Sequence, residues 1–366
     1  MTPEKLKVAV IGTGMIARAG HVPAWKNLSD RVEVVGVAGT DRERTDEFAR
    51  TEGIPQAYTD WQKMLTRTKP DIVSVTTPNS YHREHTVAAL EAGAHVWCEK
   101  PASTCHADAA DMFEVAQKKG RQVFICQTLR FANEVRAAKE LVEAGRLGEI
   151  YYAEGFGMRR RGIPRWGRFH MKEHSGGGPV YDLGVHLLDR ALWIMGFPKV
   201  QAVSSMTYTK FGNRDEGIAT LVEDSGAPLG AHFPRPFDHR DFDVEDMAVG
   251  MIRFENKVVV NFKVSWAANA PDTWSTSLMG TEGGLELDPL RLTTQLDRYQ
   301  ADVALRVPPD RNVAFQGHWA AAEHFLRVLD GQEELLVKPS EVLTIMKILD
   351  AIYQSAEEGK EIAIST

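Results

Sequence analysis

The sequence predicts an α/β protein: a doubly wound parallel sheet followed by an α+β domain with a large open, mixed or antiparallel sheet. In the first third of the chain, short continuous apolar runs alternate with helical patterns, which is typical of a parallel sheet covered on both faces. After about residue 148 the apolar residues alternate over longer stretches, as in a sheet with one packed face. Because 366 residues exceed one ordinary domain, we expect domains at 1–126 and 127–366, with the C-terminal helix able to pack back on the first.

The elements of the first domain follow one another in strand–helix order. The strands are short and apolar, and we expect them at Lys7–Ile11, Val32–Ala38, Asp71–Thr76, His95–Cys98 and Val123–Cys126. Helical patterns between them predict helices at Met15–Ala24, Arg42–Thr51, Arg83–Glu91 and Ala107–Lys119. Right-handed crossovers through these helices produce a doubly wound sheet.

The second domain is predicted from longer strands and a few helices. The strands alternate in polarity, and we expect them at Ile150–Met158, Val200–Tyr208, Met247–Phe254, Val258–Trp266 and Ser275–Met279. Helices are expected at Val180–Met195, which ends before Gly196, and at His318–Leu329 and Ser340–Glu358. The segment Lys210–Asp243 is rich in glycine, proline and charge, and no regular structure is assigned to it.

Composition excludes several classes of protein. The chain has 43 Lys and Arg against 50 Asp and Glu, a net charge of −7, which argues against a nucleic-acid partner. No apolar run approaches the ~20 residues that span a bilayer, so no membrane partner is expected. The first residues lack the pattern of a signal peptide. Cys98, Cys105 and Cys126 form no disulfide or zinc pattern, so we expect a reducing, cytoplasmic location.

A glycine-rich turn follows the first predicted strand. Gly12-Thr13-Gly14-Met15-Ile16-Ala17 has the spacing of the Rossmann dinucleotide fingerprint, with alanine in the third place. Gly12 permits the tight turn, Gly14 lets the backbone approach a pyrophosphate, and Ala17 lets the helix pack on its strand. The helix N-terminus then presents N–H groups to the anion. The pattern predicts a dinucleotide site that includes Gly12, Gly14, Met15 and Ile16.

The second strand leaves the coenzyme open between NAD and NADP. An acid at its tip would bind the ribose hydroxyls of NAD, but Gly39 occupies that place. Thr40 and Arg42 are suited to a 2′-phosphate, and Asp41 is equally suited to a ribose contact or to capping the next helix. We therefore expect NAD(P), with a slight preference for NADP.

Residues able to do chemistry cluster at strand ends and on one helix. Thr77-Pro78-Asn79 and Glu99-Lys100-Pro101 follow the third and fourth strands, at the edge where doubly wound sheets bind ligands. Asp182 and His186 are four residues apart after the triple glycine at 176–178, so they share a helix face, and Asp189 continues the polar stripe. A solvated surface is the alternative for each of them.

Together these motifs resemble the glucose–fructose oxidoreductase, inositol dehydrogenase and MocA family over nearly the whole chain. The resemblance implies an N-terminal Rossmann domain, a C-terminal α/β domain with an open sheet, and oxidation of a secondary hydroxyl of a sugar, sugar derivative or cyclitol. It assigns the catalytic roles to Lys100, Asp182 and His186. The expected coenzyme site consists of the glycine turn with Thr40, Asp41, Arg42, Thr77, Pro78, Asn79, His82, Glu99 and Lys100. The segment Lys210–Asp243 is long for the family and is expected to border the substrate entrance.

His186 is the expected general base. Its ordinary pKa is near ~6.5, whereas a lysine base near ~7.5 needs a shift of about 3 units, roughly 4 kcal/mol. Lys100 is then the cation that stabilises the alkoxide, and Asp182 orients His186 or the sugar. Lys100 as the base remains the rival assignment. Arg165 and Trp166 are further candidates for substrate contact, with a solvated loop or a subunit contact as the alternative.

Other functions were weighed against this one. The HxxEH pattern at His170, Glu173 and His174 lacks a third ligand, so no metal site is expected. Two alternatives share the fold: a glycoside-cleaving enzyme that uses NAD for transient oxidation and elimination, and a non-catalytic coenzyme-binding sensor. Apolar residues on both faces of the later strands, among them Met251, Val259, Trp266 and Trp274, predict a homodimer or homotetramer through the C-terminal sheet.

Overall fold

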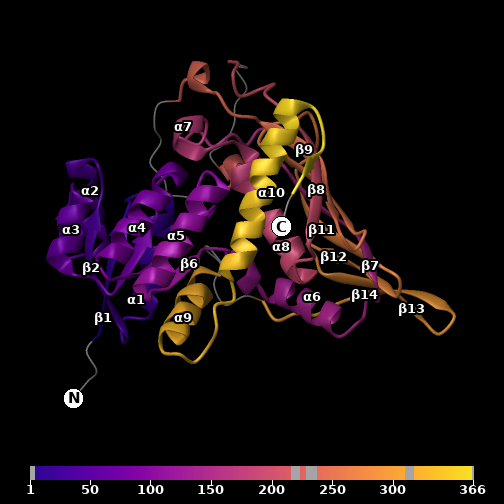
Figure 1. The fold of residues 1–366 in the computed structure, drawn as a ribbon, viewed down its shortest axis with the longest axis horizontal. Helices are drawn as coiled ribbons and strands as arrows, with labels where there is room; N and C mark the ends of the chain where they lie inside the picture. The colour runs from indigo at the N-terminus through magenta and orange to yellow at the C-terminus, as the bar shows by residue number, and fades with distance from the viewer. Residues whose placement is uncertain (1–4, 216–222, 228–236, 310–316, 365–366) are drawn as a thin grey trace. The chain divides into compact units, whose positions relative to one another are not determined.

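The fold is described from a computed structural model in which residues 5–215, 223–227, 237–309 and 317–364 are placed (Figure 1). The chain divides into two compact units. The first unit is built on Met1–Thr128 with Asn312–Leu343, and the second on Leu129–Gly226, Arg235–Arg311 and Thr344–Thr366. No described helix is long and apolar enough to cross a membrane.

The first unit contains a six-stranded parallel sheet of order β3-β2-β1-β4-β5-β6, which confirms the predicted doubly wound sheet. Its strands are β1 (Leu6–Ile11), β2 (Val32–Ala38), β3 (Ala57–Tyr58), β4 (Ile72–Val75), β5 (His95–Cys98) and β6 (Val123–Ile125). Its core includes the buried rings of Trp25, Trp97 and Phe124. Because the strands are parallel, the loops after β1, β4 and β5 lie at the same edge of the sheet.

Helices connect these strands as predicted, with additions. They are the π-turn η1 (Ala17–His21), α1 (Val22–Asn27), α2 (Arg42–Glu52), α3 (Trp61–Thr68), η2 (Asn79–Tyr81), α4 (His82–Glu91), α5 (His106–Lys119), η3 (Thr128–Phe131) and, later in the chain, α9 (His318–Leu329). The helix expected at Met15–Ala24 therefore divides into η1 and α1. The short strand β3 and the helix α3, which begins after the Asp60 N-cap, were not expected from the sequence. The sequence signal for both is weak because they span two and eight residues.

The second unit contains a nine-stranded mixed sheet of order β14-β13-β12-β11-β7-β10-β9-β8-β15. The five predicted strands are present as β7 (Ile150–Met158), β8 (Val200–Tyr208), β9 (Met247–Phe254), β10 (Val259–Ser265) and β11 (Thr273–Gly280). Strand β7 lies parallel to β10 and antiparallel to β11, so β11 does not pair with β10 although it follows β10 in the chain. The unpredicted strands are β12 (Gly283–Leu287), β13 (Arg291–Leu296), β14 (Tyr299–Ala304) and β15 (Ile362–Ala363), and β14 and β15 form the two edges of the sheet.

The helices of this part of the chain are α6 (Asn133–Glu143), α7 (Lys172–Ser175), the π-turn η4 (Val180–Gly184), α8 (Val185–Ile194) and α10 (Pro339–Glu358), with short turns η5 (Glu223–Ser225) and η6 (His239–Asp241). Of these, η4 packs on β10, and α8 packs on β7 and β11. Gly155 and Gly157 of β7 face Leu187 of α8, so the helix approaches the sheet closely. Trp266, one of the apolar residues named on the two faces of these strands, is fully buried.

The segment Lys210–Asp243 lies partly outside the described residues. Its start is anchored by Asp246, whose carboxylate accepts the backbone N–H groups of Lys210, Phe211 and Gly212 at 2.7, 2.6 and 3.0 Å. Three hydrogen bonds to one carboxylate oxygen hold the chain tightly where it leaves β8.

Candidate active site

The glycine turn has the geometry that its sequence predicts. Gly12 adopts a φ of +112°, and a Cβ at this position would lie 2.6 Å from Thr76 Oγ1 and 2.7 Å from the Thr76 carbonyl oxygen. Any larger residue at 12 is thus strained both by conformation and by contact. Gly14 differs, because a Cβ there would meet nothing within 4 Å. Gly14 leaves open space beside the N-terminus of a helical segment, as a pyrophosphate requires.

The tip of β2 explains the missing acid. A Cβ on Gly39 would lie 2.4 Å from Thr45 Oγ1 and 3.0 Å from the Thr13 side chain, so a carboxylate has no room at this position. Asp41 caps α2 by accepting the N–H of Arg44 at 2.9 Å. Thr40 is exposed, and the exposed Arg42 pairs with Asp46 at 2.7 Å.

His82 ties the loop after β4 to the loop after β5. It is fully buried, with Nε2 at 2.9 Å from the carbonyl oxygen of Thr77 and Nδ1 at 2.8 Å from that of Pro101. Burial lowers the pKa of His82, and Lys100 lowers it further, whereas the hydrogen bonds of the ring to the two carbonyls and the charge of Glu99 raise it. His82 therefore connects the backbone of the Thr77-Pro78-Asn79 loop with that of the Lys100-Pro101 loop.

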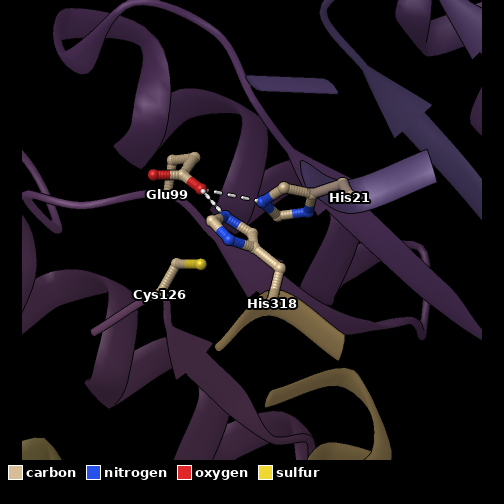
Figure 2. Close-up of side chains that lie close together, drawn as sticks. All are labelled: His21, Glu99, Cys126 and His318. Carbon is tan, nitrogen blue, oxygen red and sulfur yellow. Dashed lines mark hydrogen bonds and ion pairs between the residues drawn. The ribbon is translucent and has the colours of Figure 1, made fainter. Parts of the chain in front are cut away.

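Glu99 and Lys100 lie at the end of β5 with different surroundings. The Glu99 side chain is buried against His21 and His318 (Figure 2). Lys100 is half-buried. The backbone N–H of Lys100 donates to Glu99 Oε2 at 3.1 Å. Neither His21 nor His318 was singled out from the sequence, because neither belongs to a local motif with Glu99.

The triple glycine positions the helix that carries Asp182. A Cβ on Gly177 would lie 1.9 Å from the Tyr353 hydroxyl, and one on Gly178 would lie 2.0 Å from the Glu245 carbonyl oxygen. The Glu245 carboxylate accepts the N–H groups of Gly178 and Val180 at 2.9 and 3.1 Å, which caps the start of η4. Burial raises the pKa of Glu245 even though these hydrogen bonds oppose it.

Asp182 lies in the π-turn η4. π-Turns that interrupt helices are frequent at functional sites. Its Oδ2 accepts the indole N–H of Trp266 at 2.9 Å and lies 3.7 Å from Arg159. His186 follows on α8 and is half-buried. Arg159 and Trp266 are partners of Asp182 that sequence reasoning missed; only the arginine run at 159–161 offered a signal.

Asp189, the third acid of the predicted stripe, has a structural partner. It is fully buried and forms a bidentate ion pair with Arg130, whose Nη2 and Nε donate to the two carboxylate oxygens at 2.6 and 2.9 Å. The pair joins α8 to the segment before α6. Asp189 therefore has a structural role. Asp182 and His186 differ from it because both are partly exposed.

The remaining candidates lie between β7 and η4. Arg165 is exposed and stacks on Phe237, while half-buried Trp166 donates its indole N–H to Ser225 at 2.6 Å. His174 of the HxxEH pattern contacts Arg168 at 2.7 Å and Glu173 at 3.1 Å. Among the described residues, the one group with metal-ligand spacing is His21, Glu99, Cys126 and His318, not this pattern.

A parallel doubly wound sheet with this glycine turn, followed by an open-sheet domain, defines the class of NAD(P)-binding oxidoreductases. Residues 6–127 match the oxidoreductase family with an NAD-binding Rossmann fold, and residues 139–364 match the C-terminal α/β domain of the same family. The chain belongs to this glucose–fructose oxidoreductase, inositol dehydrogenase and MocA family.

Among curated relatives, the D-glucoside 3-dehydrogenase of Escherichia coli is 32% identical over 366 residues, covering 100% of this chain and 99% of the relative. The NADP-dependent scyllo-inositol 2-dehydrogenase of Bacillus subtilis is 24% identical, covering 99% and 96%. Among solved structures, levoglucosan dehydrogenase in complex with NADH and levoglucosan superposes with a TM-score of 0.81 at 22% identity, covering 99% and 100%. An oxidoreductase domain protein from Kribbella flavida has a TM-score of 0.83 at 21% identity, covering 100% of both chains. At these identities the structures show the shared fold.

Proposed function

We propose that this protein transfers a hydride between a secondary hydroxyl of a sugar, sugar derivative or cyclitol and the nicotinamide of NAD(P). The observation that carries the proposal is the combination of the open Gly14 turn with the fixed Lys100 loop at one edge of the sheet. Domain 1–126 carries the coenzyme, and domain 127–366 carries the substrate-binding residues Asp182 and His186. D-glucosides are the first substrates to test, because the E. coli D-glucoside 3-dehydrogenase is similar over the full length of the chain.

The residues of the first unit fit a dinucleotide. Gly14 to Ile16 offer an exposed turn at a helix N-terminus for the pyrophosphate. Thr77-Pro78-Asn79, Glu99 and Lys100 lie at the same sheet edge, with His82 buried beneath them. Because the side chains of Glu99 and His82 are buried, we expect them to act on the coenzyme through the loops they hold.

The coenzyme supplies the hydride acceptor when bound. His186 accepts the hydroxyl proton, Lys100 stabilises the developing alkoxide, and Asp182 orients the hydroxyl or His186. Trp266 and Arg159 support this role by fixing the Asp182 carboxylate. Arg165 and Trp166 contribute substrate contacts, with Trp166 presenting its ring face to a sugar.

NADP is the preferred coenzyme in this proposal. Thr45 and Thr13 fill the space at Gly39 where an acid would repel a 2′-phosphate. Thr40 and Arg42 are exposed beside it, and a guanidinium pairs well with phosphate.

The proposal includes assembly into a homodimer or homotetramer. It also includes a reducing compartment such as the cytoplasm. The three cysteines are free, and two of them are buried. The face of the large sheet opposite α8 carries exposed Met206 and Met279, and such apolar exposure is typical of an interface.

The test is a substrate scan with purified protein. D-glucosides, other sugars and cyclitols are supplied with NAD⁺ or NADP⁺, and coenzyme reduction is followed at 340 nm. We expect reduction with at least one D-glucoside or cyclitol, and a lower KM for NADP⁺ than for NAD⁺. Glycoside cleavage without net reduction would favour the elimination enzyme instead. Coenzyme binding without either reaction would favour the sensor.

A further inference from the structure

Both oxygens of the Glu99 carboxylate contact groups of the first unit. Figure 2 shows the contacts of one oxygen with His21 and His318. Oε1 lies 2.9 Å from His21 Nε2 and 3.3 Å from His318 Nε2. Oε2 accepts the backbone N–H of Lys100 at 3.1 Å. The residue is 7% exposed, so these contacts replace the water that an ionised carboxylate needs.

The three groups come from distant parts of the sequence. His21 ends the π-turn η1, which follows the glycine turn, and His318 begins α9. A Cβ on Gly20 would lie 2.7 Å from the His318 ring, so the glycine allows the imidazole to reach Glu99. Glu99 thus links the helix of the phosphate turn and α9 to the loop that carries Lys100.

The charge states suit a carboxylate held by two N–H donors. Burial raises the pKa of Glu99, but hydrogen bonds from His21 and His318 outweigh burial and hold it well below its usual range. Burial also lowers the pKa of His21, despite the opposing effect of Glu99. An ionised Glu99 therefore accepts from a neutral His21 ring that carries its proton on Nε2.

A metal ion is the competing occupant of this cluster. Cys126 joins the other three side chains, and one donor atom from each lies within 4.8 Å of the rest, a set that zinc accepts. However, His21 Nδ1 is buried with no hydrogen-bond partner. A metal on Nε2 would force the proton onto Nδ1, where a metal-bound histidine normally donates it to an acceptor. Direct pairing with Glu99 leaves only a lone pair there, which costs less than an unpaired N–H.

We propose that Glu99, held by His21 and His318, is a positioning residue that fixes the backbone at Lys100 and thereby aims the Lys100 side chain. The inference rests on the proposed role of Lys100 in the reaction. Its physical basis is that a carboxylate already fixed by two rings restrains the Lys100 N–H without reorganising. A displacement of about 1 Å at a reacting group can cost ~100-fold in rate.

The variants are E99Q and H318N, with H324N as the matched control. His324 lies on the same helix α9 and also pairs with a glutamate, Glu333 at 2.6 Å, while its Nε2 accepts the backbone N–H of Leu336 at 3.0 Å. We expect E99Q and H318N to exchange the Lys100 amide hydrogen at least ~10-fold faster and to lower kcat ~10- to 100-fold. H324N should change the Lys100 exchange rate, kcat and coenzyme Kd by less than ~3-fold.

Hydrogen exchange of the Lys100 amide can be measured without any substrate turnover. It therefore tests the contact of Glu99 with Lys100 independently of the proposed function. If the native protein oxidises no sugar, the proposed function is wrong. The exchange result still shows whether Glu99 restrains the Lys100 backbone N–H. Unchanged exchange at Lys100 in E99Q, or an equal kcat loss in H324N, would overturn the positioning role. One equivalent of metal in the native protein that H318N loses, with no Nε2–H signal from His21 by NMR, would overturn it in favour of a metal site.

Discussion

The carboxylate of Asp182 accepts a hydrogen bond from the indole N–H of Trp266 at 2.9 Å. Trp266 is fully buried just beyond the end of β10, and Arg159, which follows β7, approaches the same oxygen at 3.7 Å. The orientation of Asp182 is thus determined by the sheet as well as by its own helix. A fixed, partly exposed carboxylate beside a guanidinium is suited to holding a hydroxyl or an imidazole.

Replacing Asp182 by Asn should separate catalysis from folding. The amide oxygen can still accept the Trp266 N–H, but the negative charge is lost. We expect kcat to fall ~100-fold, in the range of a positioned acid–base group, while Tm changes by less than about 3 °C. Steady-state kinetics and thermal unfolding measure both quantities. Full activity in this variant would exclude Asp182 from the site.

Gly12 and Gly14 should respond differently to substitution. Gly14→Val places its side chain in open space, so the fold should persist while coenzyme Kd rises at least ~10-fold through a clash at the pyrophosphate. Gly12→Ala instead meets Thr76 at a φ of +112°, and should lower the free energy of unfolding by about 1–3 kcal/mol. Fluorescence titration with NADPH and urea unfolding distinguish the two effects. An unchanged Kd in Gly14→Val would place the pyrophosphate elsewhere.

The pH dependence of kcat should assign the base. His186→Asn should lower kcat strongly and abolish the acidic limb of the kcat–pH profile, because it removes the group that accepts the hydroxyl proton. Lys100→Met should lower kcat but retain that limb. Coenzyme Kd should be nearly unchanged in His186→Asn, since the phosphate turn lies in the first unit. If His186→Asn keeps the limb, Lys100 is the base.

His85 should make the protein less stable in mild acid. Burial, with a smaller contribution from His82, lowers the pKa of His85 from 6.5 to about 4. Between these values the unfolded chain binds the proton and the folded protein does not, so stability rises with pH across this window. We expect His85 to account for about 2 kcal/mol of lost unfolding free energy between pH 7 and pH 5. In urea titrations, His85→Asn should lose less stability over this interval, whereas His239→Asn should behave as the native chain.

The outer face of the large sheet should form the subunit interface. Met206, Val249, Lys263 and Phe156 are successive cross-strand neighbours, on the face opposite the glycines that contact α8. We expect light scattering to give a dimer or tetramer at micromolar concentration. Met206→Lys should shift the mass toward the monomer, whereas Leu296→Lys, at a more exposed apolar position on β13, should not. A monomeric native protein would contradict the prediction.

Local sequence determined the fold class and the motif-bearing loops. Apolar strands of four to seven residues and the glycine spacing are read within short windows, so the six-stranded sheet's main strands and the Gly12 turn were predictable. The same windows placed Lys100 at a strand end and Asp182 on a helix. They also left Asp41 open, and the structure shows it capping α2.

Only the tertiary structure decided the partners of these residues. Glu99 lies 78 positions from His21 and 219 from His318, and Trp266 lies 84 from Asp182. No periodicity links residues at such separations, because the contacts arise when whole elements pack. The same reason explains Asp189, whose spacing matched the polar stripe but whose burial beside Arg130 gives it a structural role. Sequence determined which groups are available to the chemistry, and packing determined which of them are buried, charged and held in place.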